Sequence, residues 1–485
     1  MTKNRALFIF SILVTVLSSA FPVRAADAKA KPNFLFIIAD DLNDWIGPMK
    51  GHPQAKTPNL DKLAARGLTF MNAQIAAPIC NPSRASFMTG RRPSTTGIYD
   101  NQQPAMPHIP KGVAINDYLR NHGYTTLGAG KIYHYRQYRA EDWDKVVFAQ
   151  DDTLPNHKAE RRPGPFGYRM FTEEKPTEKF NEQRAESKLV DAQTVSWCID
   201  ELEARKKQDE SFFMTCGIHR PHTPWDVPKK YFDLYPLDSL QLPEIKTNDL
   251  ADVPAAGLAF AKPDGVHAAI VKAGLWKDRV RAYLAAVSFM DAQVGRLLDA
   301  LDKSAHRDNT IIIFVSDHGW HLGEKEHWAK SALWRDSTRV PFIWVAPGVT
   351  KPGTISHRAV DTTSIFPTIC ELAGAPIPKH AEGVSIKALL ENPTKEWKQP
   401  AITTHLRNNH AITIEDWRYI RYADGSEELY NQKNDPNEWT NVAATPEHAG
   451  VKKDLAKFLP KVNAQPVAHT DENAPKRKRK AGKAK

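Results

Sequence analysis

Unbroken apolar runs that end in polar residues recur along the chain and predict buried strands. They lie at 33–39, 212–216, 310–316 and 341–345. Runs of this kind, with no alternating polar positions, are typical of strands covered on both faces of a mainly parallel sheet. Between them, apolar residues recur at helical spacing over 278–301, and a shorter helix is predicted to begin at Thr57-Pro58 and end at Gly67. Strands that alternate with helices predict an α/β layered fold with a mostly parallel central sheet.

The pattern changes towards the C-terminus. Apolar and polar residues alternate over 401–406 and 417–422, which predicts half-buried antiparallel strands. We therefore expect a main domain over 26–395 and a smaller C-terminal α+β subdomain over 396–465. Poorly periodic stretches predict two surface insertions, at 141–176 and 238–274.

The two chain ends differ in composition from the body. Basic residues precede a mostly apolar run over 6–21, and Val23-Arg24-Ala25 resembles a cleavage site. This predicts a signal peptide over 1–25 and an exported chain, periplasmic or secreted. An uncleaved anchor is the alternative, but the run is short for a membrane span. No later segment is long and apolar enough to span a bilayer, so no stable membrane insertion is expected after cleavage.

Residues 466–485 are predicted to be a disordered basic tail, which carries much of the formal net charge of +10. Tethering to an anionic polysaccharide is a sharper interpretation of this tail. Nucleic acid is not an expected partner of an exported chain.

Length and cysteine content narrow the class further. The chain has 485 residues, of which 41% are hydrophobic, which is enough for one large domain with an appendage or for two domains. The cysteines are Cys80, Cys198, Cys216 and Cys370. This number excludes a disulfide scaffold, and we expect the last three to be small buried residues. The sequence leaves the oligomeric state open.

A short motif surrounds Cys80. It reads Cys80-Asn81-Pro82-Ser83-Arg84, followed by Thr89-Gly90-Arg91. Pro82 suits the first turn of a helix that starts at Cys80, and the free N–H groups at such a start attract an anion. Arg84 follows one turn later on the same side and could stabilise negative charge.

The motif resembles the signature of the type I sulfatases, which depend on formylglycine. In that family a maturation enzyme oxidises the cysteine to Cα-formylglycine, and the hydrated aldehyde is the nucleophile. The resemblance implies these catalytic roles for Cys80 and Arg84. A plain thiolate nucleophile is the alternative, but it gives no reason for the surrounding motif.

Two acidic clusters follow predicted strands, Asp40-Asp41 and Asp317-His318. Carboxylate oxygens suit Ca²⁺ or Mg²⁺. Neighbouring residues of a strand face opposite ways, so both aspartates can reach one ion only if the chain turns there. The resemblance implies that these residues and Cys80 bind the cation, for which Ca²⁺ is predicted and Mg²⁺ kept open. Many relatives have asparagine in place of His318, and a histidine indicates the iduronate-2-sulfatase-like branch.

Three further motifs resemble elements of the same family. They are Gly130-Lys131-Ile132-Tyr133-His134, Arg220-Pro221-His222-Thr223-Pro224 and Trp328-Ala329-Lys330. The resemblance implies that Lys131, His222 and Lys330 bind sulfate. It also makes His134 a base and His222 a possible proton donor to the leaving oxygen. Fixed donors around one anion stabilise the charge that develops during sulfuryl transfer.

The resemblance extends over most of 31–441 and implies an alkaline-phosphatase-like fold. It predicts a sulfuric ester hydrolase that acts on a sulfated sugar or polysaccharide. His405, Arg407 and His410 are candidates for binding a carboxylate or second sulfate; the alternative is that they are polar residues in contact with solvent. The alternatives are a choline sulfatase, a phosphomonoester or phosphodiester hydrolase on the same scaffold, and a sulfated-glycan-binding protein without activity.

Overall fold

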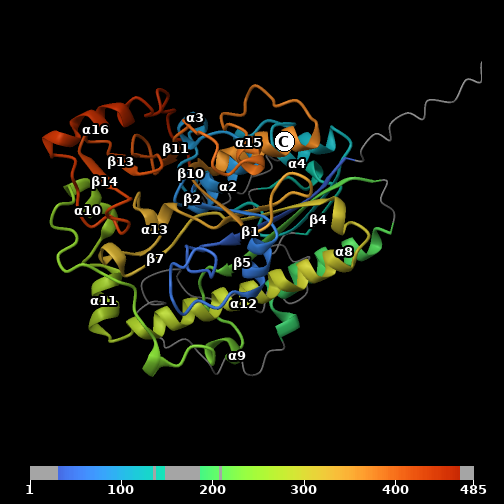
Figure 1. The fold of residues 1–485 in the computed structure, drawn as a ribbon, viewed down its shortest axis with the longest axis horizontal. Helices are drawn as coiled ribbons and strands as arrows, with labels where there is room; N and C mark the ends of the chain where they lie inside the picture. Colours follow the sequence, from blue (N-terminus) through green and yellow to red (C-terminus); the bar gives the residue numbers. More distant parts are fainter. Residues whose placement is uncertain (1–30, 135–137, 148–185, 207–209, 470–485) are drawn as a thin grey trace, which may run out of the picture. The chain divides into compact units, whose positions relative to one another are not determined.

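An eight-stranded sheet forms the centre of the chain in a computed structural model that describes residues 31–134, 138–147, 186–206 and 210–469 (Figure 1). The strand order is β10-β2-β9-β6-β1-β5-β3-β4, and β9 is antiparallel to both of its neighbours whereas the other pairs are parallel. The strands are β1 (Asn33–Asp40), β2 (Leu68–Gln74), β3 (Thr125–Gly130), β4 (Lys145–Val147), β5 (Phe212–Pro221), β6 (Thr310–Ser316), β9 (Phe342–Val345) and β10 (Thr354–Asp361).

Both faces of this sheet are covered. Along β1, Leu35 and Ile37 point into one core while Phe34 and Phe36 point into the other, and all four side chains are fully buried. Helices α1 (Pro58–Ala65), α8 (Val190–Ala204) and α12 (Trp276–Lys303) pack on the first side. The second side is covered by α2 (Cys80–Thr89), α4 (Ile115–Arg120), α14 (Ile365–Ala373) and α15 (Lys387–Glu391). The α/β layered fold predicted from the apolar runs is therefore confirmed.

A second, antiparallel sheet lies towards the C-terminus. It comprises β11 (Ala401–Thr404), β12 (His410–Thr413), β13 (Trp417–Arg421) and β14 (Glu427–Asn431), and α16 (Ala449–Ala456) packs against it through Leu455. Arg418 joins the two sheets: this buried side chain on β13 donates to Gln74 Oε1 at 2.9 Å and pairs with Glu438 at 2.5 Å.

The stretch 238–274, predicted as a surface insertion, is more ordered than its sequence indicated. It contains α10 (Ala255–Ala261) and α11 (Val266–Lys272). Val253 and Ala261 are buried in one cluster with Trp334 and with Tyr422, which directly follows β13. Small apolar residues mediate this packing, and they leave little helical periodicity for a sequence pattern to show.

The remaining short α-helices and strands of the described residues are α3 (Pro93–Thr96), α9 (Lys229–Phe232), β7 (His321–Leu322), β8 (Trp328–Ala329) and α13 (Arg335–Thr338). Cys198, Cys216 and Cys370 are buried and unpaired, as expected. Among the described residues, no helix is both long and apolar enough to cross a bilayer. The predicted signal peptide, the insertion from 148 to 176 and the tail from 470 onwards lie outside the described residues.

Candidate active site

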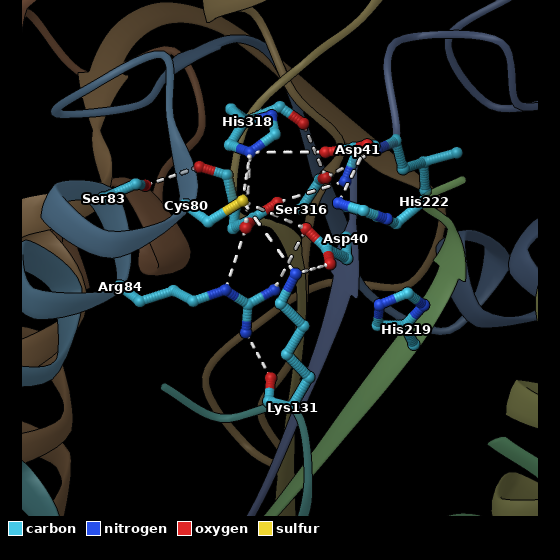
Figure 2. A network of polar contacts seen from close by, with 12 residues as sticks. Asp40, Asp41, Cys80, Ser83, Arg84, Lys131, His219, His222, Ser316 and His318 are labelled. Carbon is cyan, nitrogen blue, oxygen red and sulfur yellow. Dashed lines mark hydrogen bonds and ion pairs between the residues drawn. The ribbon is translucent and has the colours of Figure 1, made fainter. Parts of the chain in front are cut away.

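The carboxyl ends of four neighbouring strands meet at one edge of the large sheet (Figure 2). β1 ends at Asp40, β6 at Ser316, β5 at Pro221 and β3 at Gly130. Sheets of this kind place their binding sites where such ends converge. Helix α2 begins over the same edge, so Cys80 faces the polar residues that follow each strand (Figure 2).

Cys80 is fully buried at the first position of α2, with its side chain at the centre of the cluster. Its Sγ lies 3.2 Å from His318 Nε2, 3.2 Å from Lys330 Nζ and 3.7 Å from Asp40 Oδ1. His134 also hydrogen-bonds with this thiol. Burial alone would raise the pKa of Cys80, but the charges of Lys131 and Lys330 hold it well below its ordinary value. The position thus favours negative charge.

A candidate cation site lies next to Cys80. One ligand atom each from Asp40, Asp41, Cys80 and His318 lies within 4.8 Å of the others. Asp41 has a left-handed backbone with φ of 67°, and this is the turn that lets adjacent aspartates face the same place. Asp41 Oδ2 is buried without a hydrogen-bond partner among the described residues. His318 Nδ1 contacts the Gly319 carbonyl at 3.0 Å, which directs the lone pair of Nε2 towards the cluster. These donors fit a divalent cation.

Asp317 lies beside this set but is held by other groups. It accepts from Arg84 Nε at 2.8 Å and from the backbone N–H of Asp41 at 3.1 Å. Burial raises the pKa of Asp317 to about 6, and burial raises that of Asp41 to about 7. A bound cation would favour the ionised form of both carboxyls.

Arg84 is fully buried beneath the cluster and is engaged on several sides. In addition to Asp317, it lies 3.5 Å from Asp40 Oδ1 and donates to the carbonyls of Lys131 and Ile132. The guanidinium therefore orders two acidic residues and the chain after β3. Its contacts are with the protein, whereas the sequence suggested a contact with the reacting anion.

The expected sulfate-binding residues surround Cys80. Lys131 pairs with Asp40, and Lys330 donates to Asp41 Oδ1 at 2.6 Å while lying 5.5 Å from the ring centre of Trp320. His222 Nδ1 donates to the Thr223 carbonyl at 2.5 Å, and its Nε2 lies 3.9 Å from Asp41 Oδ2. Burial, followed by the charge of Lys131, holds the pKa of His222 well below its ordinary value, so this imidazole is neutral.

Three residues that position the site were missed by sequence reasoning. Ser83 Oγ donates to the Asp317 carbonyl at 2.5 Å, and Ser316 Oγ accepts from the backbone N–H of Leu42 at 2.9 Å. Asp191 accepts from the backbone N–H of His219 at 2.6 Å and of Arg220 at 3.0 Å. Ser83 lies within the motif around Cys80, and Ser316 ends the apolar run that precedes Asp317, so both positions carried a usable signal. Nothing in the sequence marked Asp191, because its partners lie on β5.

The candidate sugar-reading residues do not touch Cys80 in the described contacts. Arg407 Nε donates to the Asn463 carbonyl at 3.1 Å, and His410 Nδ1 contacts Thr404 Oγ1 at 3.0 Å. His405 follows β11 and packs edge-on against Phe260, with ring centres 4.8 Å apart. These three residues lie in or beside the connection between β11 and β12, and each contacts a different partner.

Comparison with known proteins places this geometry in a family. A model of the sulfatase family matches residues 32–375, and a model of the C-terminal region of N-sulphoglucosamine sulphohydrolase matches 323–465. A sulfatase from Formosa agariphila is 37% identical over 90% of this chain and 87% of its own length. Human iduronate 2-sulfatase is 32% identical over 75% of this chain and 74% of its own.

The fold is also found in solved structures. A phosphonate monoester hydrolase of Agrobacterium radiobacter superposes with a TM-score of 0.72 at 22% identity, covering 88% of this chain and 94% of its own. At that identity the likeness concerns the fold alone. The fold expected from the resemblance is confirmed.

Proposed function

The chain belongs to the sulfatase family, hydrolases that act on sulfate esters, and we propose that its substrate is a sulfated sugar or polysaccharide, as in the iduronate-2-sulfatase-like branch. One observation supports this most strongly: Cys80 Sγ lies 3.2 Å from both His318 Nε2 and Lys330 Nζ. The nucleophile position therefore adjoins the candidate cation ligands and a cationic side chain at once. The relative human iduronate 2-sulfatase is named for a sulfated sugar acid, and this supports the proposed substrate class.

We propose that Cys80 is converted to Cα-formylglycine. Because this residue is fully buried in the fold, a maturation enzyme would have to reach it before the chain folds. The hydrated aldehyde would supply two hydroxyl groups: one attacks sulfur, and loss of a proton from the other expels sulfate and restores the aldehyde. Export would follow or accompany this step, consistent with the predicted signal peptide.

Protons move through groups that already contact the thiol or face it. His134, hydrogen-bonded to Cys80, would accept the proton of the second hydroxyl. Lys330, 3.2 Å from Sγ, carries protons and would donate one to the leaving alcohol oxygen as the ester S–O bond breaks. His222 is the alternative donor. Because its Nε2 carries the lone pair in the neutral form, it must first take up a proton.

Asp40, Asp41, Asp317, His318 and residue 80 would hold Ca²⁺, with Mg²⁺ the alternative. When bound, the cation would act as a Lewis acid on the sulfate oxygens. Hard carboxylate oxygens suit both ions, and the buried imidazole nitrogen of His318 does not distinguish Ca²⁺ from Mg²⁺. Lys131 and Lys330 would balance the remaining sulfate charge.

Matched esters test this proposal. We expect kcat/KM for 4-nitrophenyl sulfate to exceed that for 4-nitrophenyl phosphate by at least about 10-fold, and sulfated sugars to be better substrates than choline sulfate. Cys80→Ala removes the attacking group and is the matched control. Faster phosphate ester hydrolysis would favour the phosphohydrolase alternative. Binding of sulfated glycans without sulfate release would instead indicate a silent glycan-binding protein.

A further inference from the structure

We propose that Lys262 and His405 form a second anion-binding subsite beside the candidate active site around Cys80, and that this subsite binds a carboxylate or an additional sulfate on the substrate's sugar. This inference rests on the proposed function, since it assumes that a sugar sulfate reacts at residue 80. It adds Lys262, from the stretch 238–274, to the residues expected to recognise substrate.

Three chain segments converge beside Lys330. His327 joins two of them, because its Nε2 contacts the Lys330 carbonyl at 3.0 Å and its Nδ1 contacts the Ala261 carbonyl at 2.8 Å. The C-terminal end of α10 is therefore held directly against the segment whose lysine reaches Cys80. His405 belongs to the third segment and lies close enough to His327 for their charges to interact.

The third segment is tied to the chain that leads into Cys80. Thr404 donates its backbone N–H to the Ala76 carbonyl at 2.8 Å, and Ser331 donates to the Pro78 carbonyl at 3.0 Å. The end of β11 and the neighbour of Lys330 thus both bind residues 76–78, immediately before Cys80. These contacts attach the neighbour of His405 and the neighbour of Lys330 to the same segment, the one that leads into Cys80.

Both proposed residues have unused binding capacity. His405 is 4% exposed, and its Nδ1 is buried without a hydrogen-bond partner in the described part of the chain. Buried polar atoms without partners are uncommon and call for an explanation such as a ligand. Lys262 is exposed, ends α10 in a left-handed conformation with φ of 51°, and forms no ion pair with the described residues. Its charge nevertheless acts on both His405 and His327.

An anion suits this pair better than a neutral group. The Lys262 ammonium provides charge, and burial lowers the pKa of His405 to about 3, so its imidazole is a neutral hydrogen-bonding group. A carboxylate or sulfate accepts hydrogen bonds from both. Arg407 and His410, in contrast, already contact the Asn463 carbonyl and Thr404. His410 Nε2 is also buried without a hydrogen-bond partner among the described residues, but it is His405 on which the charge of Lys262 acts.

The test uses fluorogenic 4-methylumbelliferyl glycosides that carry one sulfate, placed in turn at each free ring hydroxyl. Each is made as a neutral hexoside, as a hexuronide and as a hexoside with a second sulfate, and sulfate release is measured by ion chromatography. We expect the wild-type enzyme to prefer a hexuronide or a disulfated hexoside over the neutral hexoside. The arm that shows the preference identifies the anion. We compare kcat/KM for the preferred anionic substrate with kcat/KM for the neutral hexoside. For Lys262→Gln, the ratio of these two values should fall at least about 10-fold relative to the wild type.

His405→Gln should reduce the same ratio, whereas Lys272→Gln, an exposed lysine on α11, should leave it unchanged. A wild-type enzyme without preference for a second anion would overturn the subsite. So would a Lys262→Gln variant whose ratio equals that of the wild type. Hydrolysis of 4-nitrophenyl sulfate separates the two proposals: cleavage of this ester with no sugar sulfate cleaved contradicts the proposed sugar substrate and the subsite with it.

Discussion

Arg84 shows how much of the site depends on one buried side chain. Its partner Asp40 ends β1 and its partner Asp317 follows β6, and the Arg84–Asp317 contact spans 233 positions of the sequence. Removing one member of a buried ion pair leaves the other charge uncompensated. The residue should therefore matter for stability as well as for activity.

For Arg84→Met, we predict that the free energy of unfolding falls by about 3–5 kcal/mol. Misplacement of the two aspartates should also lower kcat/KM by at least about 100-fold. Arg66→Met is the matched control, since the ion pair of Arg66 with Asp302 is 32% and 38% exposed and should contribute less than about 1 kcal/mol. Equal effects of the two substitutions in chemical denaturation would contradict the assigned role.

His410 gives a prediction about pH. Burial lowers its pKa to about 4 in the folded chain, against about 6.5 in the unfolded chain. The unfolded chain therefore binds a proton first, so the stability that His410 provides is present above pH ~6.5 and is lost as the pH falls towards 4. We expect the stability difference between wild type and His410→Gln to shift by about 1.4 kcal/mol per pH unit in that window. Denaturant titrations of the two proteins at a series of pH values measure this difference.

The sequence motifs predicted which residues would form the site, but they did not predict which groups each of these residues would contact. The motif around Cys80 indicated a helix start, and α2 begins there. Both aspartates can reach one ion only because the backbone turns at Asp41 in the left-handed region, and the residue types at this position do not predict such a turn. The bonds of Arg84 to its own chain were hidden because they depend on strand order.

The end of β5 illustrates how elements position the site. Asp191 lies at the start of α8, is buried, and binds the two backbone N–H groups that precede the His222 turn. Its loss would leave two buried donors unpaired, each costing about 1–3 kcal/mol.

We predict that Asp191→Ala lowers kcat by about 10- to 100-fold, because the His222 turn becomes loose. Asp191→Asn retains one acceptor and should recover part of the activity. Glu203→Ala, an exposed change on the same helix, is the control. If Asp191→Ala lost stability but kept the wild-type kcat, the aspartate would support the fold without positioning the site.

Strands were easier to predict than their directions. The apolar run at 310–316 matches β6, and that at 33–39 matches β1 to within one residue. β9 is antiparallel, however, and its run is as unbroken as the others. An unbroken apolar run indicates that both faces of a strand are buried. Both faces are buried equally whether the strand runs parallel or antiparallel to its neighbours, so the run does not predict its direction.

For the whole molecule, the candidate cation links chemistry to stability. A ligand that binds the folded but not the unfolded chain stabilises the fold by about 2.7 kcal/mol at a concentration 100 times its Kd. We therefore predict that a chelator lowers both the activity and the thermal midpoint, and that Ca²⁺ restores both. Asp41→Asn removes a ligand and should make the midpoint insensitive to the chelator. Full activity with no ion detected by elemental analysis would contradict the site.

The mass of the peptide that contains residue 80, taken from purified active enzyme, tests directly whether Cys80 is converted to formylglycine. We predict a peptide about 18 Da lighter than the cysteine form, because one oxygen replaces a sulfur and two hydrogens. The modified fraction should also rise and fall with specific sulfatase activity. An unmodified Cys80 thiol throughout a fully active preparation would contradict it.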